Sequence, residues 1–249
     1  MLTEASDPAC SILHDAASPR MLRWKNYHVG EECLLICNGP SLNRVDWSRV
    51  PEHLTKFGLN KIYLGAARFG FLPRYLCCVN EMVLRQSASE LNRLQAVRFV
   101  SNRLGEDWYP DTPLQYRLNT QQVPQDADMF SRDPCAYVVE GWTVTYVALQ
   151  IIHYMGFQRV SIVGMDHRYD QAVPGEENLP STIAGDDCDH FDPRYFGGQQ
   201  WDQPDLANSE NAYRVAKDVY EREGRALVDY TIEGACRVFE RRSIDELYN

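Results

Sequence analysis

The sequence predicts an α/β fold with a mostly parallel sheet, helices on both of its faces, and a lid segment in the C-terminal half. Two observations predict this class. Leu34–Cys37 form an apolar run that leads directly into the turn residues Asn38–Ser41, which is typical of a parallel strand that ends at a ligand site. An amphipathic helical pattern over 144–155 ends at Gly156, and a β-branched strand follows at 159–163, as in a βαβ crossover of a Rossmann-like fold.

Composition and charge narrow the class further. The 249 residues are 44% hydrophobic, which is ample for the core of a single domain spanning residues 1–249. The net charge of −10 argues against a nucleic-acid partner, because binding a phosphate backbone needs a basic face. No run approaches the roughly 20 apolar residues of a transmembrane segment, and residues 1–9 carry no signal-peptide pattern. The eight cysteines form no C-x-x-C pair, so we expect a reduced, cytoplasmic protein.

Local patterns predict the other elements in chain order. Apolar runs predict strands at 33–37, 57–60, 75–79, 96–100, 159–163 and 226–229. Helical spacing of apolar residues predicts helices at 11–27, 81–94, 143–155 and 206–223, with a short helical piece at 46–51. Ser243 and Glu246 have capping-box spacing and predict a short capped turn. Residues 101–137 show few periodic signals and are predicted to form a long irregular excursion of the kind that often binds ligands.

Asparagines close three of the predicted strands. Asn38 follows the strand at 33–37, Asn60 ends the next one, and Asn80 follows the third. The carboxyl ends of parallel strands meet at one edge of a sheet, so we expect these side chains at one site. Amide groups both donate and accept hydrogen bonds, which suits a neutral, hydroxyl-rich ligand. The alternative for each is an ordinary turn asparagine.

Gly39, Pro40 and Ser41 complete the turn after Asn38. Gly39 lets the backbone approach a ligand, and Ser41 can cap the next helix or present backbone N–H groups to an anion. The missing Gly-Lys-Ser/Thr excludes a P-loop, and the missing glycines exclude a dinucleotide fingerprint. A plain strand-to-helix turn capped by Ser41 is the alternative.

Two further features are expected at the same edge. The helix predicted at 143–155 opens with Gly141, Thr143 and Thr145, and the free N–H groups of its first turn favour an anion. Asp166 follows the strand at 159–163, where it could orient a ligand hydroxyl or hold a cap.

Residues 167–205 are predicted to form a flexible lid. Its acidic cluster consists of Asp186, Asp187, Asp189, His190 and Asp192. These residue types suit a hard cation, but a solvated acidic loop is the favoured interpretation, and no metal site is predicted. Unpaired like charges this close would tend to hold the loop open when it is empty.

Several of these blocks together resemble known transferase families. The Asn-Gly-Pro-Ser-Leu block at 38–42, the segments at 45–51 and 57–64, and the later blocks at 143–156 and 160–166 are similar to the bacterial sialyltransferases that decorate lipo-oligosaccharide. The same elements occur in the MptE-like family, whose archaeal member is a 6-hydroxymethylpterin diphosphokinase, and Gly141–Thr145 is closer to that family. The resemblance covers about residues 33–64 and 138–170, more weakly 207–229, and implies a GT-A-like version of the fold.

The resemblance also implies roles for individual residues. Asn38, Gly39, Ser41 and Asn60 match positions that hold the cytidine nucleotide of the donor, together with Pro40, which stiffens their turn. Thr143 and Thr145 match the donor or acceptor pocket. A catalytic histidine on the family's lid points to His190, since His167 sits at the lid's root. Tyrosines that meet the leaving phosphate point to Tyr169 or Tyr195, and Asp166 is counted with the catalytic residues.

The sequence therefore favours a glycosyltransferase. It would take a nucleotide-activated sugar, such as a CMP-linked nonulosonate, and pass it to a glycan or a small hydroxyl acceptor without a required metal. One alternative is a diphosphokinase that moves pyrophosphate from ATP to a hydroxymethylpterin-type substrate, which needs Mg²⁺. Another is a non-catalytic nucleotide- or sugar-binding module. The oligomeric state stays open.

Overall fold

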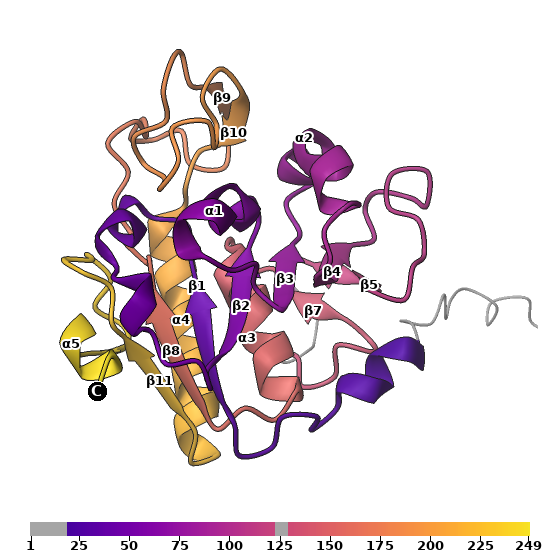
Figure 1. The fold of residues 1–249 in the computed structure, drawn as a ribbon. Coiled ribbons are helices and arrows are strands. Elements are labelled where there is room, and N and C mark those ends of the chain that lie inside the picture. Colours follow the sequence, from indigo (N-terminus) through magenta and orange to yellow (C-terminus); the bar gives the residue numbers. More distant parts are fainter. Residues whose placement is uncertain (1–18, 123–128) are drawn as a thin grey trace, which may run out of the picture.

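The computed structural model describes residues 19–122 and 129–249 and is built around an eight-stranded sheet (Figure 1). The strand order is β12-β11-β8-β1-β2-β3-β4-β5, and every pairing in it is parallel. The central strand β1 (Glu32–Ile36) lies between β8 (Arg159–Val163) and β2 (Thr55–Leu59). The predicted α/β class and the mostly parallel sheet are confirmed.

The remaining strands extend this sheet or form small pairs beside it. In the main sheet they are β3 (Tyr75–Cys78), β4 (Val97–Ser101), β5 (Gln115–Leu118), β11 (Ala226–Asp229) and β12 (Glu240–Arg241). Two further pairs are formed by β6 (Thr120–Gln121) with β7 (Val138–Val139), and by β9 (Pro180–Thr182) with β10 (Gln200–Asp202).

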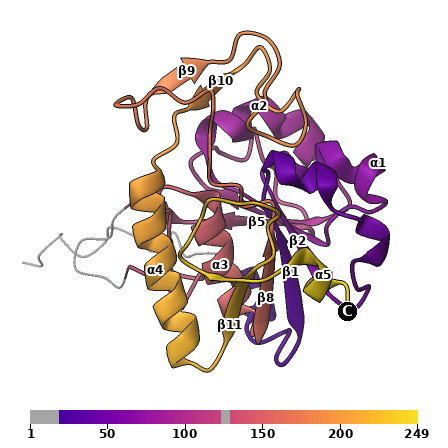
Figure 2. The same cartoon turned by 90° about the vertical axis from the view of Figure 1, so that its left-hand side faces the viewer.

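Helices cover both faces of the sheet (Figure 2). The long ones are α2 (Glu81–Leu91), α3 (Val144–Tyr154) and α4 (Leu206–Arg222). The short ones are α1 (Ala66–Phe69), α5 (Ile244–Leu247) and four 3₁₀ segments: η1 (Pro19–Trp24), η2 (Pro40–Arg44), η3 (Trp47–Arg49) and η4 (Ile62–Gly65). The capping box predicted for Ser243 and Glu246 is confirmed at α5.

Strand β1 shows why both faces are apolar. Cys33 and Leu35 pack into the core cluster that contains α3 and α4, whereas Leu34 and Ile36 pack into the cluster that contains α2 and α5. Side chains of a strand alternate between faces, so a strand that is buried on both sides reads as one continuous apolar run. Most strands of the sheet were predicted from apolar runs of this kind.

Two expectations need correction. The helix predicted at 11–27 lies partly outside the described residues, and Pro19–Trp24 form only a 3₁₀ turn. The excursion predicted at 101–137 contains the edge strand β5 and the short strand β6. The pattern of β5 was obscured because Gln115 is fully buried, where its amide oxygen accepts a hydrogen bond of 3.3 Å from the buried Arg98 guanidinium. A buried polar pair of this kind removes the apolar signal on which strand prediction relies.

The lid segment 167–205 lies across the carboxyl ends of the strands, with the β9–β10 pair beside α2 (Figure 1). Side chains of the sheet domain hold it there. The Asn80 amide donates to Asp202 Oδ2 at 2.6 Å, and the Gln86 amide donates to the Gln200 carbonyl at 2.7 Å. The edge of the sheet and the lid thus enclose a space between them.

Candidate functional site

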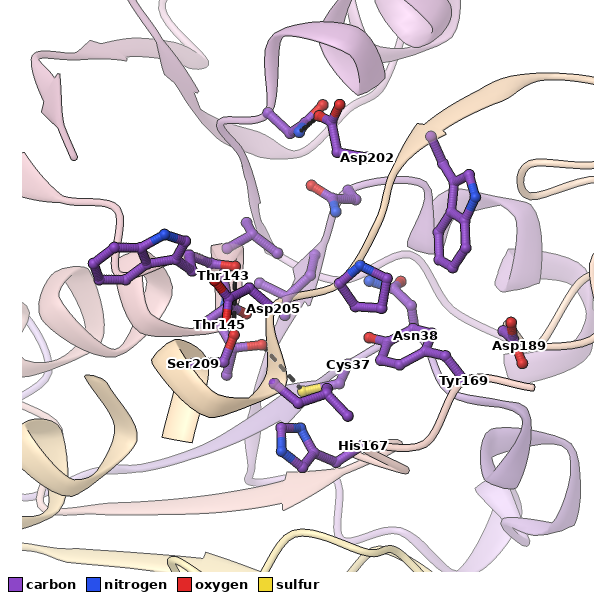
Figure 3. Close-up of a pocket in the computed structure, with 18 of the residues that line it drawn as sticks. Cys37, Asn38, Thr143, Thr145, His167, Tyr169, Asp189, Asp202, Asp205 and Ser209 are labelled. Atoms are coloured by element: carbon purple, nitrogen blue, oxygen red, sulfur yellow. Dashed lines mark hydrogen bonds between the residues drawn. The ribbon is translucent and has the colours of Figure 1, made fainter. Parts of the chain in front are cut away.

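A cavity of about 360 Å³ lies between the carboxyl ends of the strands, the start of α3 and the lid (Figure 3). Its lining includes most of the site residues predicted from the sequence, but not Pro40, Ser41 or Gly141. Those that line it are Asn38, Gly39, Asn60, Thr143, Thr145, Asp166, Tyr169 and His190. The rule that parallel strands bring their carboxyl ends to one edge accounts for Asn38, Asn60 and Asp166, which each follow a strand.

Asp166 holds the turn that follows β1. Its carboxylate accepts hydrogen bonds from the Ser41 backbone N–H at 3.1 Å and from the Ser41 hydroxyl at 2.6 Å. A Cβ on Gly39 would lie 1.9 Å from Asp166 Oδ2, so only glycine fits beside this carboxylate. Burial raises the pKa of Asp166, and the two Ser41 hydrogen bonds oppose that rise. Asp166 was expected either to orient a ligand hydroxyl or to hold a cap. The structure shows the second arrangement, in which both the backbone N–H and the hydroxyl of Ser41 donate to Asp166.

Asn38 and Asn60 both bring an unpaired oxygen to the site. Their Oδ1 atoms are buried, and among residues 19–122 and 129–249 neither makes a hydrogen bond. The Asn60 side chain lies near the Tyr195 hydroxyl, and this contact opposes the rise that burial causes in the pKa of Tyr195. Asn60 adopts the left-handed φ of 47°, which asparagine tolerates better than most residues. Buried polar atoms are rarely left unpaired, so two unpaired oxygens lining one cavity indicate a ligand with hydrogen-bond donors.

The start of α3 forms another wall of the cavity. Thr143 is the N-cap, and its hydroxyl accepts a hydrogen bond of 3.3 Å from the Thr145 N–H. The same hydroxyl lies 3.2 Å from the Tyr213 hydroxyl, while the Thr145 hydroxyl lies 3.8 Å from Cys37 Sγ. The helix that was predicted to open over Gly141–Thr145 begins at Val144 with Thr143 as its cap, and its positive end lies at the cavity.

His190 is held from two directions on the lid. Its Nδ1 lies 2.8 Å from Asp187 Oδ2, and its ring stacks on Tyr195 with centroids 4.0 Å apart and planes 5° apart. The Asp187 side chain is 0% exposed, and its oxygens also accept the N–H groups of Asp189, His190 and Phe196. With Nδ1 engaged, Nε2 is the nitrogen left to act on a ligand.

Asp187 holds His190 in place, and the sequence did not distinguish it from its acidic neighbours. Burial by itself would raise the pKa of Asp187, but hydrogen bonds from His190 and from backbone N–H groups hold the pKa below its ordinary value. A carboxylate that stays ionised beside an imidazole fixes the tautomer and stabilises the imidazolium. The spacing of three residues between Asp187 and His190 was visible in the sequence, but their pairing depends on the fold of the lid.

The expectation of unpaired charges in the lid is wrong. Asp187 is paired as described above. Asp189 accepts hydrogen bonds from the Asp170 and Gln171 N–H groups at 2.6 and 2.9 Å, and Asp192 accepts two from the Arg194 guanidinium at 2.8 and 2.9 Å. Three of the four carboxylates of the cluster thus have local partners, and Asp186 is exposed to solvent. Throughout the part of the chain that the structure describes, no three His, Cys, Asp or Glu side chains converge as a metal site would require.

Tyr169 lies among the aromatic rings of the lid. Its ring centroid is 6.1 Å from that of His190 and 5.9 Å from that of Trp201. Burial raises the pKa of Tyr169, and the negative charges of Asp189 and Asp166 add to the rise. The phenol therefore remains protonated near neutral pH and can donate a hydrogen bond into the cavity.

A second histidine, His167, also lines the cavity. Its Nε2 lies 3.3 Å from Glu210 Oε1 on α4, and its backbone has a left-handed φ of 54°. Figure 3 shows His167 on the side of the cavity near Cys37, away from the residues of the β10 strand. The sequence had placed it only at the root of the lid.

Further cavity-lining residues come from the segment that leads into α4. Asp205, which accepts the Asn208 N–H as the N-cap of α4, and Ser209 both line the cavity (Figure 3). Gln203 lines it as well, and its amide nitrogen is buried without a partner among the described residues. The amphipathic pattern predicted α4, but not which of its first residues face a ligand site.

Comparisons with known proteins support the fold. No family model and no curated protein matches the chain, so the MptE-like resemblance has no support from a family model. The structure resembles the MAf glycosyltransferase from Magnetospirillum magneticum AMB-1, with a TM-score of 0.53 and 14% identity over 91% of this chain and 38% of that chain. A weaker likeness, with a TM-score of 0.44, links it to the sialyltransferase CstII from Campylobacter jejuni in complex with CMP-3FNeuAc, with 13% identity over 84% of this chain and 88% of that chain.

The likeness to the MAf enzyme concerns the architecture of the chain. The chain has a fold that is also found in glycosyltransferases, and it spans about 38% of the length of the MAf enzyme. Within residues 19–122 and 129–249, no helix is both long enough and apolar enough to cross a membrane.

Proposed function

We propose that the chain is a glycosyltransferase that moves a sugar from a nucleotide-activated donor to a hydroxyl acceptor. The observation that carries this proposal is that one cavity joins the unpaired oxygens of Asn38 and Asn60 to the fixed His190–Asp187 pair. The first feature suits a ligand rich in hydroxyl and amine donors, and the second suits removal of a proton from a hydroxyl group. The shared architecture with glycosyltransferases supports the same class.

In the proposed reaction, His190 Nε2 takes the proton from the acceptor hydroxyl as its oxygen attacks the anomeric carbon of the donor sugar. The bond between that carbon and the phosphate oxygen breaks, and its electron pair stays on the leaving phosphate. Asp187 stabilises the imidazolium that forms on His190. The Tyr169 phenol and the positive end of α3 at Thr143 stabilise the leaving phosphate.

The remaining predicted residues divide into two groups. Asn38, Gly39, Asn60 and Thr145 line the cavity and are proposed to contact the nucleotide. Pro40 and Ser41 do not line it, and together with Asp166 they are proposed to hold the turn in shape.

The choice of a CMP-linked donor rests on the sequence resemblance of residues 33–64 and 138–170 to bacterial sialyltransferases. The diphosphokinase alternative has weaker support, because a triphosphate donor needs Mg²⁺ and cationic side chains. The acidic residues of the cavity include Asp166, Asp189, Asp202 and Asp205. Its arginines are Arg103, which pairs with Glu140 at 2.7 Å, and Arg168.

A thermal-shift panel with CMP, CDP, UDP and ATP, each with and without Mg²⁺, tests this proposal. We expect CMP to stabilise the protein without metal, because ligand that binds only the folded state raises the unfolding temperature. Stabilisation by ATP only in the presence of Mg²⁺ would favour the diphosphokinase, and no stabilisation by any nucleotide would contradict both.

The matched variants are Asn38→Ala and Asn102→Ala. Asn38 lines the cavity, whereas Asn102 is exposed just beyond β4 and does not line it. We expect Asn38→Ala to abolish the CMP shift and Asn102→Ala to keep it. Equal CMP shifts in both variants would remove Asn38 from the binding site.

A further inference from the structure

Lys61 is a buried cation that joins the sheet to the lid. It follows Asn60 directly and is 3% exposed. Its ammonium group donates three hydrogen bonds: to the Tyr195 carbonyl at 2.6 Å, to Gln199 Oε1 at 2.9 Å and to Gln86 Oε1 at 2.8 Å. An ammonium has three protons, so all of its donors are used, and two of the three acceptors belong to the lid.

The residues that Lys61 holds are those that fix the His190–Asp187 pair. The Tyr195 ring, whose backbone carbonyl accepts from Lys61, stacks on His190. The neighbouring Phe196 donates its N–H to Asp187 Oδ2 at 3.0 Å, and its ring centroid lies 4.7 Å from the Lys61 nitrogen. The Lys61 ammonium therefore contacts both Tyr195, which stacks on the His190 ring, and Phe196, which donates to the Asp187 carboxylate.

We propose that Lys61 is a positioning residue for His190. Its hydrogen bonds connect the lid residues around His190 to the end of β2, next to Asn60. The proposed nucleotide site at Asn60 and the proposed base His190 therefore keep a fixed position relative to each other. This inference rests on the proposed function, because the geometry matters only if His190 acts on a ligand at this site. A misplacement of about 1 Å can cost roughly 100-fold in rate, so such a tie has a large effect on turnover.

The chemistry of Lys61 agrees with this role. Burial lowers the pKa of Lys61 to about 8, with the charges of Cys78, Asp187 and Glu90 opposing the shift. Burying a cation costs free energy, which an apolar side chain of similar length at this position would not incur. Its three hydrogen bonds are directional, so they fix the positions of the groups that they join more closely than an apolar contact would.

The test compares Lys61→Met with Lys56→Met. Methionine keeps an unbranched chain but cannot donate. Lys56 provides the matched control, because it lies near the amino end of the same strand and donates to the Pro51 and Glu52 carbonyls, away from the cavity. We expect Lys61→Met to lower kcat by about 10- to 100-fold while CMP affinity, measured by calorimetry, changes less than about threefold. Lys56→Met should leave both values within about twofold.

A readout on His190 itself separates positioning from stability. In protein labelled with ¹³C at the histidine ε1 carbons, the His190 signal should shift in Lys61→Met and stay unchanged in Lys56→Met. Gln199→Ala, which removes one acceptor of the ammonium, should lower kcat by a smaller factor, and it carries the test should Lys61→Met fail to fold.

Three outcomes would overturn the inference. One is an unchanged kcat in a folded Lys61→Met protein, which would make Lys61 a purely structural residue. Another is a parallel loss of kcat and CMP affinity, which would assign it to binding. The third is an unmoved His190 signal. If the wild-type protein neither binds CMP nor turns over a donor, the proposed function fails, whereas the histidine signal still reports whether Lys61 orients His190.

Discussion

Two histidines line the same cavity, and each lies beside a carboxylate, but only one of them is held in place. His190 Nδ1 meets Asp187 at 2.8 Å, and the Asp187 side chain is 0% exposed and accepts several backbone N–H groups. His167 Nε2 lies 3.3 Å from Glu210, whose side chain is 32% exposed and also pairs with Arg214 at 2.7 Å.

The difference lies in how each carboxylate is fixed. A buried carboxylate with several hydrogen bonds has one orientation, so the imidazole beside it has one orientation too. A partly exposed carboxylate that is shared with an arginine is partly screened by solvent and can turn to either partner. Burial lowers the pKa of His167, with the charge of Glu210 opposing the shift, and no ring stacks on it as Tyr195 stacks on His190 among the described residues. Proximity of a histidine and an acid is thus insufficient to identify a general base.

The largest expected effect is the loss of His190. We expect His190→Ala to reduce transfer roughly 100- to 10,000-fold, because general-base catalysis contributes about that much, and to leave CMP affinity nearly unchanged. Steady-state transfer assays and calorimetry measure the two quantities. The comparison breaks if His167→Ala causes an equal loss of transfer, since the base would then be His167.

The next effect concerns the carboxylate that orients the base. We expect Asp187→Asn to lower kcat by about 10- to 100-fold, the usual cost of removing a partner that orients a functional imidazole. The matched change on the other pair is Glu210→Gln. A drop in kcat for Glu210→Gln as large as that for Asp187→Asn would show that both carboxylates are coupled to the reaction.

A smaller effect should appear in stability at acid pH. The pKa of Asp187 is lower in the folded protein than its ordinary value. The unfolded chain therefore binds more protons between the two values, so the contribution of Asp187 is complete above about pH 4 and is lost as pH falls through the folded value. Urea unfolding of wild type and Asp187→Asn between pH 3 and pH 7 should show a stability difference that shrinks below about pH 4. A difference that is constant with pH would contradict this assignment.

The smallest effect is expected for the His167–Glu210 pair, whose carboxylate is partly exposed. Glu210→Gln should change the free energy of unfolding by less than about 1 kcal/mol, since exposed ion pairs contribute about that much or less. Urea unfolding at neutral pH measures it. A larger loss would mean that the His167–Glu210 contact is held more firmly than its exposure indicates.

The sequence predicted most of the fold because the sheet is parallel. Strands β1, β2, β3, β4, β8 and β11 are buried on both faces and read as apolar runs, so each was recognised within a few residues of its bounds. The edge strand β5 was missed because its buried Gln115 is polar and finds its partner in Arg98 on the neighbouring strand. That compensation depends on strand pairing, which local patterns do not reveal.

The same distinction applies to the site. Asn38, Asn60 and Asp166 were expected together because each follows a strand, and the parallel sheet rule brings strand ends to one edge. Asp187 was not separated from its acidic neighbours, because its role depends on which carboxylate the folded lid buries against His190. The lid's acidic cluster looked like a run of repelling charges, since the backbone and arginine donors that satisfy it are set by turns within the lid.

By itself, the amino-acid sequence determined the class of the fold, the edge at which a ligand would sit and the short list of side chains near it. The fold class and the strand-end residues follow from short-range patterns, because periodicity and turn chemistry involve neighbouring residues, whereas His190 and Tyr169 were expected from the family resemblance. The tertiary structure alone decided which contacts join distant segments: Asp166 with Ser41, 125 residues apart, and Lys61 with Tyr195, 134 residues apart. Such contacts form only when the whole chain packs, so the residues that hold His190 in place became visible only in the folded protein.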